Sequence, residues 1–219
     1  MNPLVAAQGL WVRARTEKLP EAAGPRTGVT GEGAPLRLAV LGDSTAAGCG
    51  VDDHENGFTG ALAAALAARG HRVEWSVTGA NGATSRRVRH RLLPEVPPAT
   101  IAVLLAGTND VLARRPPGDW REDLSAIVDG LPAERVAVVG LPLFAEFPRL
   151  PRALGRYLAR RAEGLDAVAR EVCAARPNAQ WIPSAESFPV PPGFFARDGF
   201  HPSAAGYRHW ARLVAGHLT

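Results

Sequence analysis

From residue 36 onward, short apolar runs alternate with longer stretches in which alanine and leucine recur at helical spacing. The apolar runs are nearly continuous, which is typical of strands buried on both faces of a parallel sheet. The pattern therefore predicts repeated strand–helix units and an α/β fold, a three-layer α/β/α sandwich. The predicted strands cover residues 36–41, 72–77, 100–106, 135–141 and 180–183, and the predicted helices cover residues 57–69, 84–93, 119–130, 152–175 and 203–217.

The first 35 residues follow a different pattern. Residues 3–18 carry apolar side chains near helical spacing and predict one helix that ends before Pro20. Residues 20–35 are rich in Gly, Pro and Thr without periodicity, which indicates a linker or a surface arm. We therefore divide the chain into a helix and arm over residues 1–35 and a domain over residues 36–219. We expect the helix to dock on that domain, although contact of residues 1–18 with a membrane surface is an alternative.

Composition narrows the class of protein. The chain has 219 residues, 46% of them hydrophobic and 21% charged, which fits one globular domain. The formal net charge is +4, but the basic residues are scattered arginines, as in residues 86–91 and 156–161, without interleaved aromatic residues. We therefore expect solvated helix faces rather than a nucleic-acid partner.

Two further features concern location and redox chemistry. Cys49 and Cys173 are the only cysteines, and their spacing fits neither a disulfide framework nor a metal site. No apolar run is long enough to span a bilayer, and the N-terminus lacks the order of charges and apolar residues found in a signal peptide. The sequence therefore predicts a cytoplasmic protein without metal or cofactor, in which Cys49 is a small apolar residue.

Three polar, glycine-containing segments follow the first three predicted strands of the domain. They are residues 42–44, 78–84 and 107–110. In an open parallel sheet, ligands bind beyond the carboxyl ends of the strands, where strand order reverses. We therefore expect these three segments to form one rim around a site.

Ser44 is the candidate nucleophile of that site. It directly follows a predicted strand, where a strand-to-helix turn would expose its hydroxyl and a helix N-terminus would favour developing negative charge. A catalytic serine needs a base and a group that orients the base. Asp198 and His201 precede the last predicted helix, and their spacing allows the carboxylate to hold one ring nitrogen while the other faces Ser44. The histidines at positions 54, 71, 90, 209 and 217 have no such setting.

An acyl-transfer site also needs donors for an oxyanion. The candidates are the backbone amides of Ser44 and Gly82 and the side-chain amide of Asn109. Glycine at position 82 would let the backbone approach a substrate, although Gly79 is an alternative and either glycine could simply form a turn. Asn109 could likewise only cap a helix.

At this point the sequence resembles the SGNH branch of the GDSL hydrolases. The family's four blocks match Gly42-Asp43-Ser44, Asn81-Gly82-Ala83-Thr84-Ser85, Gly107-Thr108-Asn109-Asp110 and Asp198 to His201, in that order. The resemblance covers residues 36–218, and the first 35 residues match nothing general in the family. It implies a flavodoxin-like, five-stranded parallel sheet of order 2-1-3-4-5.

The resemblance implies a serine hydrolase that cleaves a carboxylic ester or thioester of a small-molecule substrate. Ser44 would be the nucleophile, His201 the base and Asp198 the orienting group, with Ser44, Gly82 and Asn109 as oxyanion donors and no cofactor. One alternative is an O-deacetylase (acetylesterase) acting on a carbohydrate or natural product, and another is a catalytically inactive binding module of the same fold. The apolar residues 141–148 would either line an acyl pocket or be ordinary core and loop.

Overall fold

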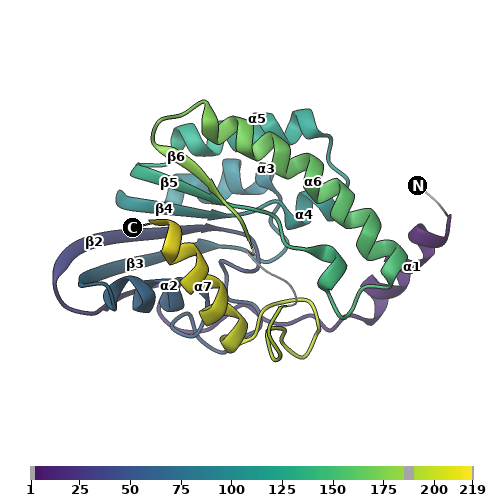
Figure 1. The fold of residues 1–219 in the computed structure, drawn as a ribbon, viewed down its shortest axis with the longest axis horizontal. Coiled ribbons are helices and arrows are strands. Elements are labelled where there is room, and N and C mark those ends of the chain that lie inside the picture. Colours follow the sequence, from purple (N-terminus) through teal and green to yellow (C-terminus); the bar gives the residue numbers. More distant parts are fainter. Residues whose placement is uncertain (1–2, 185–189, 219) are drawn as a thin grey trace.

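The computed structural model describes residues 3–184 and 190–218, and its centre is one six-stranded sheet of order β1-β3-β2-β4-β5-β6 (Figure 1). The strands are β1 (Thr27–Thr30), β2 (Ala34–Gly42), β3 (His71–Gly79), β4 (Ala99–Leu105), β5 (Ala133–Val139) and β6 (Ala179–Ile182). Strands β2 to β6 pair in parallel, in the order expected from the sequence. The predicted α/β fold is therefore confirmed.

The expectation of five strands was wrong by one, because β1 adds an antiparallel edge strand beside β3. It lies within the segment that we assigned to a linker or surface arm. Its residues alternate only between exposed and half-buried, so this segment lacks the apolar pattern of a core strand. Pairing depends instead on the backbone and on Trp75, whose indole Nε1 donates to Thr30 Oγ1 at 3.1 Å.

Helices cover both faces of the sheet (Figure 1). They are α1 (Pro3–Arg15), α2 (Phe58–Ala67), α3 (Ser85–Arg87), α4 (Thr108–Leu112), α5 (Pro117–Gly130), α6 (Arg152–Ala174) and α7 (Ala204–Leu218). Successive residues of β2 point to opposite faces: Leu38 and Val40 belong to the core under α2 and α7, and Leu41 belongs to the core under α5 and α6. This alternation explains why β4 and the second half of β2 are apolar, whereas β3 keeps the polar residues Arg72, Glu74 and Ser76 between its apolar ones.

Most predicted helices are present, and two regions differ from expectation. Residues 84–93 form a composite of α3, a π-helical turn (Val88–Leu92) and a 3₁₀ turn (Leu93–Glu95) rather than one regular helix. The short α4 and the 3₁₀ turn Phe144–Glu146 were not predicted. Within the described part of the chain, no helix combines the length and apolar character needed to cross a membrane.

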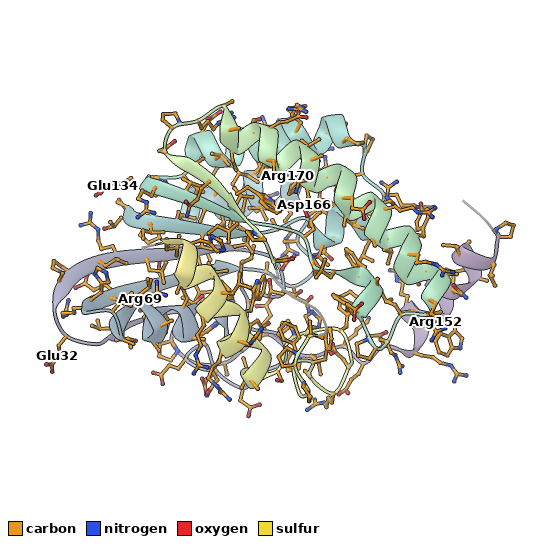
Figure 2. All side chains as sticks on the ribbon, viewed as in Figure 1. Glu32, Arg69, Glu134, Arg152, Asp166 and Arg170 are labelled. Carbon is orange, nitrogen blue, oxygen red and sulfur yellow. The ribbon has the colours of Figure 1, made fainter. Side chains whose placement is uncertain are left out.

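Helix α1 packs against the first residues of α6, where Figure 2 labels Arg152. Val5 and Val12 are buried in the same core as Leu154 and Leu158 of α6. Leu4, Leu10 and Trp11 of the same helix are exposed. The expected docking of this helix is therefore present in the structure.

Candidate active site

Ser44 lies two residues after the end of β2, at the start of a run of turns over residues 44–50. The backbone amide of its neighbour Asp43 donates to the Leu105 carbonyl at 2.9 Å. This bond connects the serine loop, residues 43–50, to the end of β4. The helix predicted from residue 57 is present as α2, which begins at Phe58. No helix N-terminus therefore lies directly after Ser44, although one was expected there, and the nearest backbone amides belong to turns.

Ser44, His201 and Asp198 form a continuous hydrogen-bonded chain. The Ser44 Oγ lies 2.9 Å from His201 Nε2, and His201 Nδ1 lies 2.6 Å from Asp198 Oδ2. With Nδ1 protonated, the ring donates to the carboxylate and Nε2 accepts the serine proton. The structure thus brings together the three residues selected from the sequence, across 157 positions between Ser44 and His201.

Asp198 is held as an anion by its surroundings. Burial raises the pKa of its carboxyl, but hydrogen bonds from the His201 ring and from the amides of Phe200 and His201 outweigh this and lower it below the ordinary value. The two amides lie 2.9 and 3.0 Å from Asp198 Oδ1. The carboxylate can therefore both orient the imidazole and stabilise a positive charge on it.

The loop that carries Asp198 and His201 is braced by aromatic side chains. Phe147, which follows β5, packs edge-to-face on Phe200 with ring centroids 4.9 Å apart and on Phe195 at 5.3 Å. The loop also closes on itself, since the Ala196 amide donates to the His201 carbonyl at 2.8 Å. These contacts fix the backbone on which the histidine sits.

The two candidate oxyanion glycines have different environments. A Cβ on Gly79 would lie 2.5 Å from the Ala47 nitrogen, so this glycine is required by close packing against the serine loop. Gly82 has a φ of +73° and open space around its missing Cβ, on an exposed turn beyond the end of β3. The structure therefore gives Gly79 a packing role and leaves Gly82 accessible to a ligand.

Asn109 lies in the first turn of α4 and reaches across to the Gly82 loop. Its Nδ2 donates to the Ala83 carbonyl at 3.0 Å. Because Nδ2 carries two hydrogens, this bond leaves one available to a ligand. Asn109 thus connects the third polar segment to the second, as expected of segments that share one rim.

A buried ionic network beneath these loops was missed in the sequence. The Asp110 carboxylate accepts from the Ser85 hydroxyl at 2.7 Å and from the Ser85 amide at 2.9 Å, and Arg115 donates to both side chains. Arg115 also pairs with Asp123 at 2.7 Å. Ser85 and Asp110 directly follow polar residues of the candidate site, which was the only signal in the sequence. Arg115 belongs to no motif that would have pointed to it.

Asp43 is a second buried carboxylate, and it is not part of the hydrogen-bonded chain. Burial raises its pKa to about 6, although the amide and hydroxyl of Thr45 donate to it. Cys49 nearby is buried, and burial raises its pKa to about 12. Its thiol is therefore neutral, in agreement with the packing role predicted for it.

A cavity of about 350 Å³ opens beside Ser44 and His201. Leu141, Pro142, Leu143 and Phe147 line it, so residues 141–148 do contribute to a pocket. The other apolar lining residues are Leu105, Ala106, Val139, Val190, Phe194, Phe195, Phe200, Pro202, Trp210 and Leu213. A largely apolar cavity of this size that also holds polar groups, Ser44 and His201 among them, is typical of a small-molecule site.

Asp166 of α6 anchors the start of the segment that lines the cavity. Its carboxylate accepts from the Leu141 amide at 3.0 Å and from the Trp181 indole at 3.2 Å. Figure 2 labels Asp166 next to Arg170, whose guanidinium lies 4.8 Å from the centroid of the same indole ring. The cavity wall is therefore attached to a long helix rather than to a free loop.

Comparison with known proteins gives consistent results. TesA is 24% identical, with 84% of this chain and 98% of that chain covered and a TM-score of 0.66. A lipase/acylhydrolase from Enterococcus faecalis is 24% identical over 84% and 95%, with a TM-score of 0.62. A variant of Axe2, an acetyl-xylooligosaccharide esterase from Geobacillus, is 18% identical over 86% and 96%, with a TM-score of 0.57.

These likenesses establish the fold, and the sequence profile of one family goes further. Curated protein sequences give no match. The profile of the GDSL-like lipase/acylhydrolase family matches residues 40–209, which include Ser44, Asn109, Asp198 and His201. Because this match spans most of the chain, the protein belongs to the GDSL-like lipase/acylhydrolase family and is a carboxylic ester hydrolase.

Proposed function

We propose that the protein hydrolyses carboxylic esters of small molecules through an acyl-enzyme formed on Ser44. The observation that carries this proposal is the chain of hydrogen bonds from Ser44 Oγ to His201 and on to Asp198, at 2.9 and 2.6 Å. A serine hydroxyl becomes an effective nucleophile when a neighbouring base takes its proton. His201 is positioned to act as that base, and Asp198 holds its ring.

The reaction proceeds in two balanced halves. Ser44 Oγ attacks the carbonyl carbon while its proton passes to His201 Nε2, and the tetrahedral intermediate then expels the alcohol, which receives that proton. Water next attacks the acyl-enzyme, gives its proton to His201 and releases the carboxylic acid as Ser44 regains a proton. Asp198 stays ionised throughout, which agrees with its lowered pKa.

The amides of Ser44 and Gly82 and the side chain of Asn109 stabilise the oxyanion in both halves. The link from Asn109 to Ala83 supports this assignment, since it joins two of the three donors in one hydrogen-bonded unit. Preorganised donors of this kind usually make the largest single contribution to acyl transfer. We choose Gly82 over Gly79 because Gly79 is packed against Ala47.

The cavity favours an acyl chain longer than acetyl. Its volume of about 350 Å³ and its apolar lining by residues such as Leu143, Phe147 and Leu213 would leave an acetyl group with few contacts. An O-deacetylase for a carbohydrate or natural product would use the same residues and is the alternative within this chemistry. A catalytically inactive module would have no need for the aligned serine, histidine and aspartate.

Steady-state hydrolysis of a series of p-nitrophenyl esters from acetyl to palmitoyl tests this proposal. We expect kcat/KM to rise from acetyl to a longer chain, and Ser44→Ala to lose at least about a thousandfold in kcat at every length. Thioesters of the same acyl groups, run in parallel, separate esterase from thioesterase activity. Activity of Ser44→Ala near the parent level would contradict the proposed nucleophile, and activity confined to acetyl esters would favour the deacetylase.

A further inference from the structure

The N-terminal arm, residues 19–26, lies across two loops of the candidate active site. The Ala22 amide donates to the Ala47 carbonyl of the serine loop at 3.0 Å, and the Ala23 amide donates to the Asp52 carbonyl at 2.8 Å. Leu19 and Ala22 are buried. The arm precedes residues 40–209, which match the family profile.

The arm also contacts the Gly82 loop through charged side chains. Glu21 Oε1 accepts from the Asn81 amide at 2.7 Å, and Arg26 Nη1 donates to the Gly79 carbonyl at 3.1 Å. Glu21 and Arg26 pair with each other at 3.0 Å. The two side chains therefore hold the loop at Gly79 and at Asn81, directly before Gly82.

The peptide group between Asn81 and Gly82, which carries the Gly82 N–H, is held through its carbonyl oxygen. Its carbonyl belongs to Asn81 and accepts from Arg87 Nη1 at 3.3 Å. In a planar trans peptide the N–H points opposite to the C=O, so holding the Asn81 carbonyl sets the direction of the Gly82 N–H. Glu21 holds the preceding peptide through the Asn81 amide. Two successive peptide planes are thus restrained at a glycine with a φ of +73°, a residue that otherwise has wide conformational freedom.

We propose that Glu21, with Arg26 and Arg87, is a positioning residue that preorients the Gly82 amide as an oxyanion donor. This inference rests on the proposed function of Gly82. Glu21 does not touch the reacting atoms; it acts through the Asn81 peptide. Because a preformed oxyanion hole stabilises the transition state more than the bound substrate, loss of Glu21 should lower kcat and leave KM nearly unchanged.

The test uses the full chain with Glu21→Ala, Glu21→Gln and Arg87→Met, assayed on the best p-nitrophenyl ester. We expect kcat to fall about tenfold in Glu21→Ala and in Arg87→Met, with KM changed by less than about twofold. Glu21→Gln retains an acceptor oxygen for the Asn81 amide and should keep at least about a third of the parent kcat. The matched control is Glu32→Ala, which removes another carboxylate at the opposite end of the sheet, where Figure 2 labels Glu32.

A second readout separates positioning of the donor from a general structural effect. A simple alkylboronic acid adds to a catalytic serine as a tetrahedral anion and therefore occupies the oxyanion hole. Its inhibition constant should rise in Glu21→Ala by about the factor by which kcat/KM falls. An unchanged kcat in both Glu21→Ala and Arg87→Met, or a rise in KM alone, would overturn the proposal. If Ser44→Ala is inactive but Glu21→Ala has the activity of the parent, only the role proposed for the arm is wrong. If Ser44→Ala is as active as the parent, the proposed function itself is wrong.

Discussion

At the scale of single residues, Asn109 has the most sharply defined role. One of its two amide hydrogens is donated to the Ala83 carbonyl, 3.0 Å away, which orients the side chain, and in the proposed mechanism the other hydrogen is donated to the oxyanion. We predict that Asn109→Ala lowers kcat about a hundred- to a thousandfold, because a single lost oxyanion donor has an effect of this size. Steady-state kinetics measure it, with thermal unfolding of the same variant as control. A folded Asn109→Ala protein with kcat within fivefold of the parent would show that the residue only ties two loops together.

Asp43 makes the stability of the protein depend on pH. Burial raises its pKa from 3.8 to about 6, so the folded state binds this proton more tightly than the unfolded chain does. The stabilisation associated with the proton is fully present below pH 4 and is lost as the pH rises through about 6. The total loss is on the order of 3 kcal/mol, from a shift of about two pKa units in a fully buried group.

Asp43→Asn removes this titration and retains an oxygen that can accept from Thr45. We predict that the free energy of unfolding of Asp43→Asn, measured in urea, increases relative to that of the parent as the pH rises from 4 to 7. Comparing the two proteins at each pH cancels the titration of all other groups. A constant difference across that range would mean that Asp43 has an ordinary pKa in the folded protein.

At the scale of elements, the helices and strands that could be predicted are those whose burial gives a periodic pattern of apolar residues in the sequence. Strand β4 and the second halves of β2 and β5 are apolar because both of their faces are covered, β3 alternates polar and apolar residues, and α6 has a clear apolar stripe. Strand β1 has neither feature, because it is an exposed edge strand held mainly by backbone pairing with β3. The run of turns over residues 44–50 was equally hidden, since these small residues fit a helix or a series of turns.

Helix α1 gives a prediction at this scale, with a matched control on the same helix. Val12 is 8% exposed and packs on the core under α6, whereas Leu10 is 71% exposed. Val12→Asp should lower the free energy of unfolding by about 2 kcal/mol or more, because it buries a charge without a partner. Leu10→Asp should change it by less than about 0.5 kcal/mol. Chemical denaturation measures both, and equal effects would mean that α1 is not docked as the structure has it.

At the scale of the whole molecule, the position of the candidate site could be predicted, because ligands bind beyond the carboxyl ends of parallel strands where strand order reverses. Applying this rule requires only the order of the strands. Ser44 and Asn109 follow adjacent strands, and β2 and β4 pair side by side. Contacts of the arm were not predictable in this way. Glu21 and Asn81 are 60 positions apart and meet through one carboxylate and one backbone amide, which leave no pattern in the sequence.

The central claim, that Ser44 forms the covalent intermediate, can be tested directly by labelling. A fluorophosphonate reacts preferentially with an activated serine, and peptide mass spectrometry locates the adduct. We predict one adduct, on Ser44, in the parent protein, a much slower reaction in His201→Ala, and none in Ser44→Ala. An adduct on another residue, or an unlabelled Ser44 in a protein that hydrolyses esters, would contradict the account.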